Sequence, residues 1–129
     1  MNQIFLNNSG LMNKLTKKEE EVMKILWKLE KAFVKDIIAE YPDPKPHYNT
    51  VSSLVRILQE KDIVGFKQYG NTYEYFPLLP KEEYRKVFMK EVINDYFDNS
   101  FPRAVASFIE DEKLDPDEIE EIINLIKSK

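Results

Sequence analysis

The order in which hydrophobic periodicity changes along this chain constrains its fold more than any other feature. Apolar residues recur at helical spacing over residues 17–28, 34–41 and 48–61. Residues that favour β-structure or alternate in polarity follow over 63–68 and 73–79. Three short helices followed by a β-hairpin predict a winged helix-turn-helix fold.

Local sequence signals set the ends of these elements. Thr16 and Glu19 have the spacing of a capping box at the start of the first helix. The three prolines of the segment YPDPKP cannot continue the second helix. Asn49 is the expected N-cap of the 48–61 helix. Gly70 and Asn71 both tolerate positive φ, so we expect them to form the tight turn of the hairpin.

Helical spacing returns in the last third of the chain. One helix is expected over 81–98, and a second begins near Pro102. A third begins after the cap residue Asp115, with Pro116 at the first helical position. The predicted fold class is therefore mainly α with a small β-hairpin, a winged helix followed by three further helices.

Composition excludes several classes of protein. The 129 residues contain no cysteine, which removes disulfides, thiolate metal sites and cysteine nucleophiles and fits a reducing compartment. No apolar run approaches the roughly 20 residues that span a bilayer, and no secretory signal is recognisable, so we expect a cytoplasmic protein. Without a glycine-rich phosphate loop, nucleophile elbow or ligand cluster, we expect no enzymatic activity, cofactor or metal.

Charge is distributed unevenly along the chain, whose net charge is −4. Residues 12–80 carry 11 basic and 10 acidic side chains, whereas residues 81–129 carry 8 basic and 13 acidic ones. The acidity therefore belongs to the last third. Such asymmetry often marks two roles in one chain, and the nearly neutral first part is the candidate for contact with nucleic acid.

The 48–61 helix has an unusual polar face. Opposite its apolar residues it carries short or forked hydrogen-bonding side chains and almost no acid, which suits a recognition helix in the major groove. The candidate base-contacting residues are Asn49, Thr50, Ser52, Ser53 and Arg56. The candidate phosphate-contacting residues are Lys45, His47, Tyr48, Lys67, Asn71 and Tyr73, the last three in the predicted wing over 67–73.

Other interpretations of these residues stay open. Ser and Asn near a helix start often cap it, and Thr50 can bond its own backbone. A lone histidine such as His47 at a helix entry is more often a cap or a phosphate contact than a metal ligand. A winged helix can also serve as a protein-interaction module that does not bind DNA.

The C-terminal helices carry too little apolar material for a core of their own, because a lone core is marginal below about 70–80 residues. They could fold back on the winged helix, but a second copy would cover their apolar faces and pair two recognition helices, so we predict a homodimer. The predicted interface comprises Tyr84, Val87, Phe88, Val92, Tyr96, Val105, Phe108, Ile109, Ile119, Ile122, Ile123 and Ile126. The predicted parts are a disordered extension over 1–11, a DNA-binding domain over 12–80 and a dimerisation domain over 81–129.

Five segments of the chain form a recognisable set in order and spacing. They are LTKKEEEVMKILW (15–27), VKDIIAEY (34–41), YNTVSSLVRILQEKDIV (48–64), GNTYEYFPLL (70–79) and FIEDEKLDPDEIEEIINLI (108–126). This set resembles the penicillinase repressor family (BlaI/MecI/CopY type). The resemblance implies a bacterial cytoplasmic repressor that binds palindromic, double-stranded operator DNA as a dimer.

The resemblance also implies a mode of regulation. Many family members are relieved when a membrane sensor-protease system triggers cleavage in the dimerisation domain, with no membrane insertion of the repressor itself. The corresponding bond here is Ser107–Phe108, where Ser107 replaces the family's Asn. Ile57 and Asp62 stand where members usually have Arg and Gly, so the operator sequence is not carried over. The copper-responsive branch uses C-terminal cysteines, which this chain lacks.

Overall fold

The computed structural model describes residues 15–128 and divides the chain into two compact units between Val87 and Phe88. The expected extension over 1–11 lies outside the described residues. The division falls within a helix rather than at the expected boundary after Pro80. Within the described part, no helix has both the length and the apolar character needed to cross a membrane.

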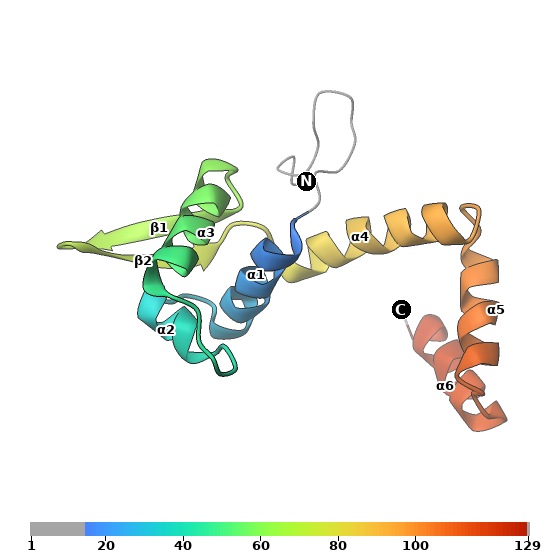
Figure 1. The fold of residues 1–129 in the computed structure, drawn as a ribbon. Coiled ribbons are helices and arrows are strands. Elements are labelled where there is room, and N and C mark those ends of the chain that lie inside the picture. The colour runs from blue at the N-terminus through green and yellow to red at the C-terminus, as the bar shows by residue number, and fades with distance from the viewer. Residues whose placement is uncertain (1–14, 129) are drawn as a thin grey trace. The chain divides into compact units, whose positions relative to one another are not determined.

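The first unit contains three helices, a hairpin and the start of a fourth helix (Figure 1). The elements are α1 (Lys17–Leu29), α2 (Val34–Ala39), α3 (Tyr48–Glu60), β1 (Val64–Tyr69), β2 (Thr72–Pro77) and α4 (Lys81–Tyr96). The hairpin extends away from the three helices as a wing. This arrangement confirms the predicted winged helix-turn-helix.

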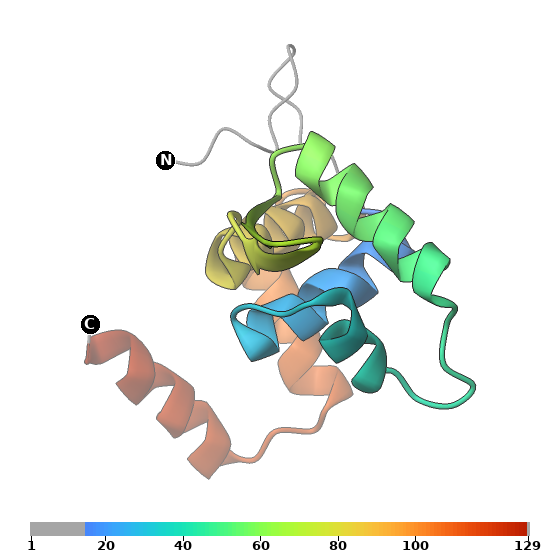
Figure 2. The same ribbon diagram turned by 90° about the vertical axis from the view of Figure 1, so that its left-hand side faces the viewer.

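The core of the first unit lies where the three helices meet. α3 packs against both α1 and α2, with the helices crossing as seen in Figure 2. Their apolar stripes, spaced at three and four residues, supply side chains with no solvent exposure. These are Val22, Met23 and Leu26 of α1, Ile37 of α2, and Val51, Val55 and Leu58 of α3. Burying one face of α3 in this way fixes its opposite face toward solvent.

The hairpin is antiparallel, with Tyr69 opposite Thr72 across a two-residue turn. Gly70 and Asn71 form this turn, as expected, and of the two only Gly70 adopts positive φ, at 60°. Two hydrogen bonds tie the hairpin to the α1–α2 connection: the Ala32 amide donates to the Tyr75 carbonyl at 2.9 Å, and the Tyr75 amide donates to the Ala32 carbonyl at 2.8 Å. The base of the wing is therefore anchored beside the start of α2.

The helix starts agree only in part with the predicted caps. Thr16 and Glu19 form the expected capping box, in which the Glu19 amide donates to the Thr16 hydroxyl at 3.1 Å and the Thr16 amide donates to Glu19 Oε1 at 2.8 Å. The assignment of Asn49 as the cap of α3 is wrong. His47, with extended backbone, occupies the N-cap, and its side chain makes no capping hydrogen bond. Asn49 lies inside the first turn, and its side chain is exposed.

The first turns of α4 belong to the first unit because an aromatic side chain anchors them there. Tyr84 is only 5% exposed, its ring lies 5.7 Å from that of Trp27, and its hydroxyl donates to Glu20 at 3.0 Å. Trp27 Nε1 in turn donates to the Leu79 carbonyl at 2.8 Å, just before α4. Tyr84 was assigned to the dimer interface, but the structure places it in the interior of the first unit, so the assignment is corrected.

The second unit consists of the rest of α4 together with α5 (Phe101–Asp111) and α6 (Pro116–Lys127). The start of α6 is as predicted, with a capping box between Asp115 and Glu118 and Pro116 at the first position. Among its described residues only Ile93 and Ala104 are buried. Its exposed large apolar residues are Tyr96, Phe101, Val105, Phe108, Ile123, Leu125 and Ile126. This unit therefore has very little interior of its own.

Candidate nucleic-acid interface

The candidate interface is built on the face of α3 that points away from the core. Four of the five predicted base-contacting side chains are exposed there: Asn49, Thr50, Ser53 and Arg56. The fifth, Ser52, is half-buried and lies on the side of the helix that faces the wing. The buried stripe repeats every three to four residues, so these polar residues occupy the remaining arc of the same helix. The sequence pattern thus correctly identified the exposed arc.

An open groove of about 940 Å³ separates α3 from the wing. Its walls come from the start of α2, from α3 and from both strands. The lining residues are Phe33, Val34, Lys35, Tyr48, Asn49, Ser52, Arg56, Gln59, Glu60, Phe66, Asn71, Thr72, Tyr73 and Tyr75. Four predicted phosphate- or base-contacting residues on α3 therefore share one concave surface with Asn71 and Tyr73 of the wing.

Basic side chains at this surface lack acidic partners. Within residues 15–128, Lys35 and Arg56 of the groove take part in no salt bridge, and neither does Lys67, which lies on β1 outside the groove lining. Three other lysines of the unit are paired with acids: Lys24 with Glu20 at 3.5 Å, Lys28 with Glu40 at 2.6 Å and Lys61 with Glu19 at 2.8 Å. Glu60 is the one acid that lines the groove. The surface therefore presents positive charge that is free to interact with an anionic partner.

The N-terminus of α3 adds to the positive character of this surface. His47 and Tyr48 at its start are both exposed, the latter by 58%. The first turn carries no acidic residue and no side-chain cap. The amide groups of a helix N-terminus attract anions when no side chain satisfies them. α1 and α6 differ, since each starts with a capping box and acids in its first turn.

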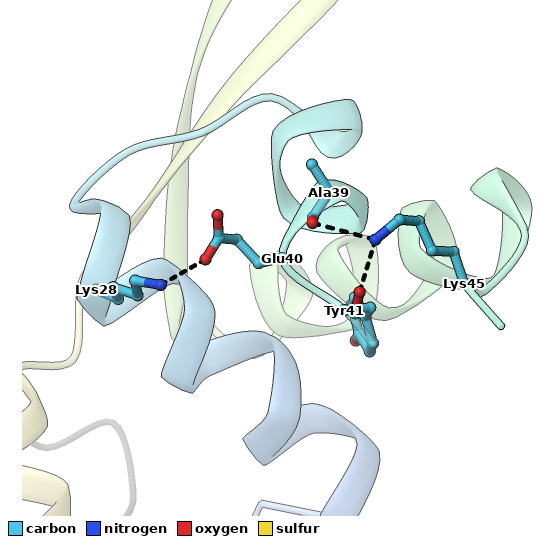
Figure 3. A network of polar contacts seen from close by, with 5 residues as sticks. All are labelled: Lys28, Ala39, Glu40, Tyr41 and Lys45. Carbon is cyan, nitrogen blue, oxygen red and sulfur yellow. Dashed lines mark hydrogen bonds and ion pairs between the residues drawn. The ribbon is translucent and has the colours of Figure 1, made fainter. Parts of the chain in front are cut away.

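Lys45 is already engaged in the structure. Its ammonium donates to the carbonyl of Ala39 at 3.2 Å and to that of Tyr41 at 2.7 Å, which caps the C-terminal end of α2 (Figure 3). The Lys28–Glu40 pair lies beside this cap in the same view. An ammonium has three donors, so a contact from Lys45 to phosphate would use its remaining one.

Aromatic rings form much of the wing side of the groove. Phe66 and Tyr73 pack edge to face with ring centres 5.2 Å apart, and each is about two-fifths exposed. Burial raises the pKa of Tyr75 above its usual value; Arg56 opposes the rise, while Tyr48 and Tyr73 add to it. At the tip, Lys67 lies over the ring of Tyr69 at 5.2 Å.

Sequence reasoning missed Phe33, Lys35 and Phe66 as residues of this surface. Phe33 and Lys35 flank the start of α2, more than a dozen positions before α3, and only the Ala32–Tyr75 pairing brings them beside the wing. A signal for Lys35 was nevertheless present. It follows the buried Val34 and falls off the apolar stripe of α2, so it has to face outward.

The remaining predicted interface residues, Val87 at the end of the first unit and the others in the second, vary in exposure. Tyr96, Val105, Phe108, Ile123 and Ile126 are exposed by 44–78%, whereas Val87, Phe88, Val92, Ile109, Ile119 and Ile122 are half-buried. The prediction omitted Phe101, which is 50% exposed at the start of α5. The Ser107–Phe108 bond lies in the middle of α5, and the Ser107 hydroxyl donates to Asp111 at 3.3 Å.

Comparison with known proteins places the chain in a family. Residues 15–128 match the model of the penicillinase repressor family. The methicillin resistance regulatory protein MecI of Staphylococcus aureus (strain N315) is 30% identical over 112 residues, covering 86% of this chain and 91% of the relative. MecI of Mammaliicoccus sciuri is 31% identical over 114 residues, with the same coverage.

A more distant relative is the penicillinase repressor of Bacillus licheniformis, 24% identical over 114 residues, which cover 84% of this chain and 86% of that protein. The family match extends over the winged helix and the three C-terminal helices alike. The members of this family are regulators of transcription and not enzymes. The chain belongs to the penicillinase repressor family and has the role of a transcriptional repressor.

Proposed function

We propose that the protein represses transcription as a homodimer that binds palindromic operator DNA with α3 in the major groove. The observation that supports this best is the combination found on one face of the first unit. Exposed Asn49, Ser53 and Arg56 lie on an arc of α3 whose N-terminus is uncapped. Cations without acidic partners flank that arc. Such a face suits base edges and phosphates.

In the proposed complex the residues divide between two kinds of contact. Arg56 is suited to bidentate bonds with guanine, Asn49 to bonds with adenine, and Thr50, Ser52 and Ser53 to either donors or acceptors. The phosphates would be met by His47, Tyr48, Lys67, Asn71 and Tyr73, with Lys45 through its remaining donor. The structure suggests adding Lys35, because it shares the groove and lacks an acidic partner.

The second unit would provide the dimer contact. Its described residues include only two buried side chains but several exposed large apolar ones. Exposed apolar surface of this kind is stabilised by burial against a partner, and a two-fold dimer would bury the same surface on both subunits. The same symmetry would present two copies of α3 to two half-sites of the operator.

Relief of repression by proteolysis is the regulatory part of the proposal. Cleavage at Ser107–Phe108 would separate the end of α5 and all of α6, including Ile123 and Ile126, from the rest of the chain. Proteases bind extended backbone, so this bond would first have to leave the helix. Co-expression with the sensor system under inducer, followed by mass analysis of the fragments, tests it. An intact chain under induction would contradict this part of the proposal alone.

The DNA-binding proposal is tested by fluorescence anisotropy with the promoter of the protein's own operon and a competitor duplex. Affinity should fall by about 0.9 log units per decade of salt for each phosphate contacted. Arg56→Ala should weaken binding by about 1–3 kcal/mol and relax specificity at one base pair. Arg85→Ala is the matched control, because Arg85 lies on α4 and pairs with Glu82 at 2.6 Å. A salt slope near zero would instead favour a protein-interaction module.

A further inference from the structure

One aliphatic side chain lies exposed on the otherwise polar arc of α3. Ile57 exposes 41% of its surface, whereas the apolar residues of the core stripe, Val51, Val55 and Leu58, expose none. We propose that Ile57 is a specificity-determining residue that contacts the C5-methyl group of a thymine in each operator half-site. The inference rests on the proposed DNA-binding function and adds a base contact to it.

The position of Ile57 on the helix places it among the proposed base contacts. It lies four residues after Ser53 and seven after Thr50, so these three side chains lie along one side of α3. Thr50 and Ser53 are exposed like Ile57. Ile57 does not line the groove beside the wing, which takes the other side of the arc, including Ser52 and Arg56. A duplex that contacts Thr50 and Ser53 from outside would therefore also meet Ile57.

The chemistry of the side chain selects one base. In the major groove thymine presents its O4 acceptor and an apolar C5-methyl group, and this methyl group distinguishes it from the other three bases. An isoleucine offers no hydrogen bond, so beside guanine, adenine or cytosine it would take a polar group out of water without a partner. Beside thymine it covers a methyl group and gains apolar contact.

The methyl group can be removed without changing base pairing. An operator is first obtained by selection from random duplexes, and each thymine is then replaced singly, and in symmetric pairs, by deoxyuridine. For the wild type we expect one symmetric pair of thymines at which replacement weakens binding by roughly fourfold per half-site and about fifteenfold for the pair. Ile57→Ala should bind the unmodified operator as weakly as the wild type binds the deoxyuridine operator.

The decisive result is the coupling between the two changes. With Ile57→Ala, deoxyuridine at that position should have no further effect, because the same contact has already been lost. Leu78→Ala, which truncates a side chain of similar exposure (45%) after β2, should keep the full deoxyuridine penalty. Ile57→Arg should shift the selected base at the same position from thymine to guanine.

Several outcomes would overturn the inference. These are the absence of any thymine whose methyl affects binding, or a deoxyuridine penalty that persists in Ile57→Ala. Circular dichroism melts of the variants separate loss of binding from loss of folding. If the wild type binds with a steep salt slope but shows no coupling, the role of Ile57 is wrong and the DNA-binding function stands. If the wild type selects no sequence at all, both are wrong.

Discussion

The ion pair between Glu19 and Lys61 should set much of the stability of the first unit, because it joins the start of α1 to the end of α3. Glu19 is 3% exposed, and the Lys61 ammonium contacts its Oε2 at 2.8 Å. Lys61→Met removes the cation and leaves the carboxylate with only its capping bond from Thr16. Loss of a hydrogen bond to a charged group costs about 1.5–3 kcal/mol. Because the side chain of Lys61 is 46% exposed, water replaces part of the lost hydrogen bond to Glu19. We therefore expect the free energy of unfolding to fall by about 1.5–2 kcal/mol.

Urea denaturation followed by tryptophan fluorescence measures this cost. Trp27 is the single tryptophan and lies in the first unit, so its signal reports the unfolding of that unit. Lys24→Met is the matched control, since it breaks an exposed pair with Glu20 at 3.5 Å on the same helix. Such a pair contributes only about 0.3–0.5 kcal/mol. Equal losses for the two variants would refute the reasoning that burial makes the Lys61 contact strong.

The same pair predicts a dependence on pH. Burial alone would raise the pKa of Glu19, but hydrogen bonds from Lys61 and Thr16, together with the charge of Lys61, outweigh it and hold the pKa below 4.5. A lowered folded-state pKa stabilises the protein fully above the usual pKa, and this stabilisation is lost as the pH falls through the folded-state pKa. Without Lys61, its hydrogen bond and its charge no longer lower the pKa of Glu19, so this pKa is higher in the variant than in the wild type. The stability difference between wild type and Lys61→Met should therefore shrink as the pH falls toward the lowered folded-state pKa of Glu19 in the wild type, and a constant difference would contradict this assignment.

Three further substitutions test other parts of the structure. Asp62→Gly should stabilise the first unit by about 0.5–1 kcal/mol in the same urea assay, because Asp62 has a φ of 60°, which glycine adopts without strain; a loss of stability would contradict this. Gly65→Ala should destabilise the unit by about 1 kcal/mol, since its Cβ would lie 2.7 Å from the ring of Phe76; unchanged stability would mean that the ring moves aside. Phe108→Glu should weaken the proposed dimer at least about tenfold in sedimentation equilibrium, because it places a charge in the apolar surface of α5. Glu110→Gln, an exposed change on the same helix, should leave the dimer intact.

Features that depend on neighbouring residues could be predicted from the sequence. The capping boxes at Thr16 and Asp115 are confirmed because each needs only two residues three positions apart in a helix. The cap of α3 was wrong for a related reason. Asn49 has a suitable side chain, but the chain enters the helix two residues earlier than a cap at Asn49 would require, so His47 takes the cap position with extended backbone. The residue type at one position does not determine where the backbone changes from extended to helical.

Features that depend on distant residues could not be predicted. The groove beside α3 exists because Ala32 pairs with Tyr75, which brings the start of α2 against the wing. No periodicity indicates that pairing. The division between Val87 and Phe88 has no sequence signal either, because α4 is one continuous helix that begins in the first unit and ends in the second. The packing of Tyr84 on Trp27 and its hydrogen bond to Glu20 show that the first turns of α4 belong to the winged helix.

The proposed dimer would link the folding of the second unit to repression. A unit with only Ile93 and Ala104 buried among its described residues gains little stability by itself, so most of its apolar burial would have to come from the partner. Association and ordering of α5 and α6 would then occur together, and operator affinity would depend on protein concentration. The same linkage explains how a single cleavage in α5 would be enough to relieve repression. Severing α5 near Phe108 would remove apolar surface from the interface and also the helix that supports it, whereas the core around Val51 and Val55 in α3 would remain folded.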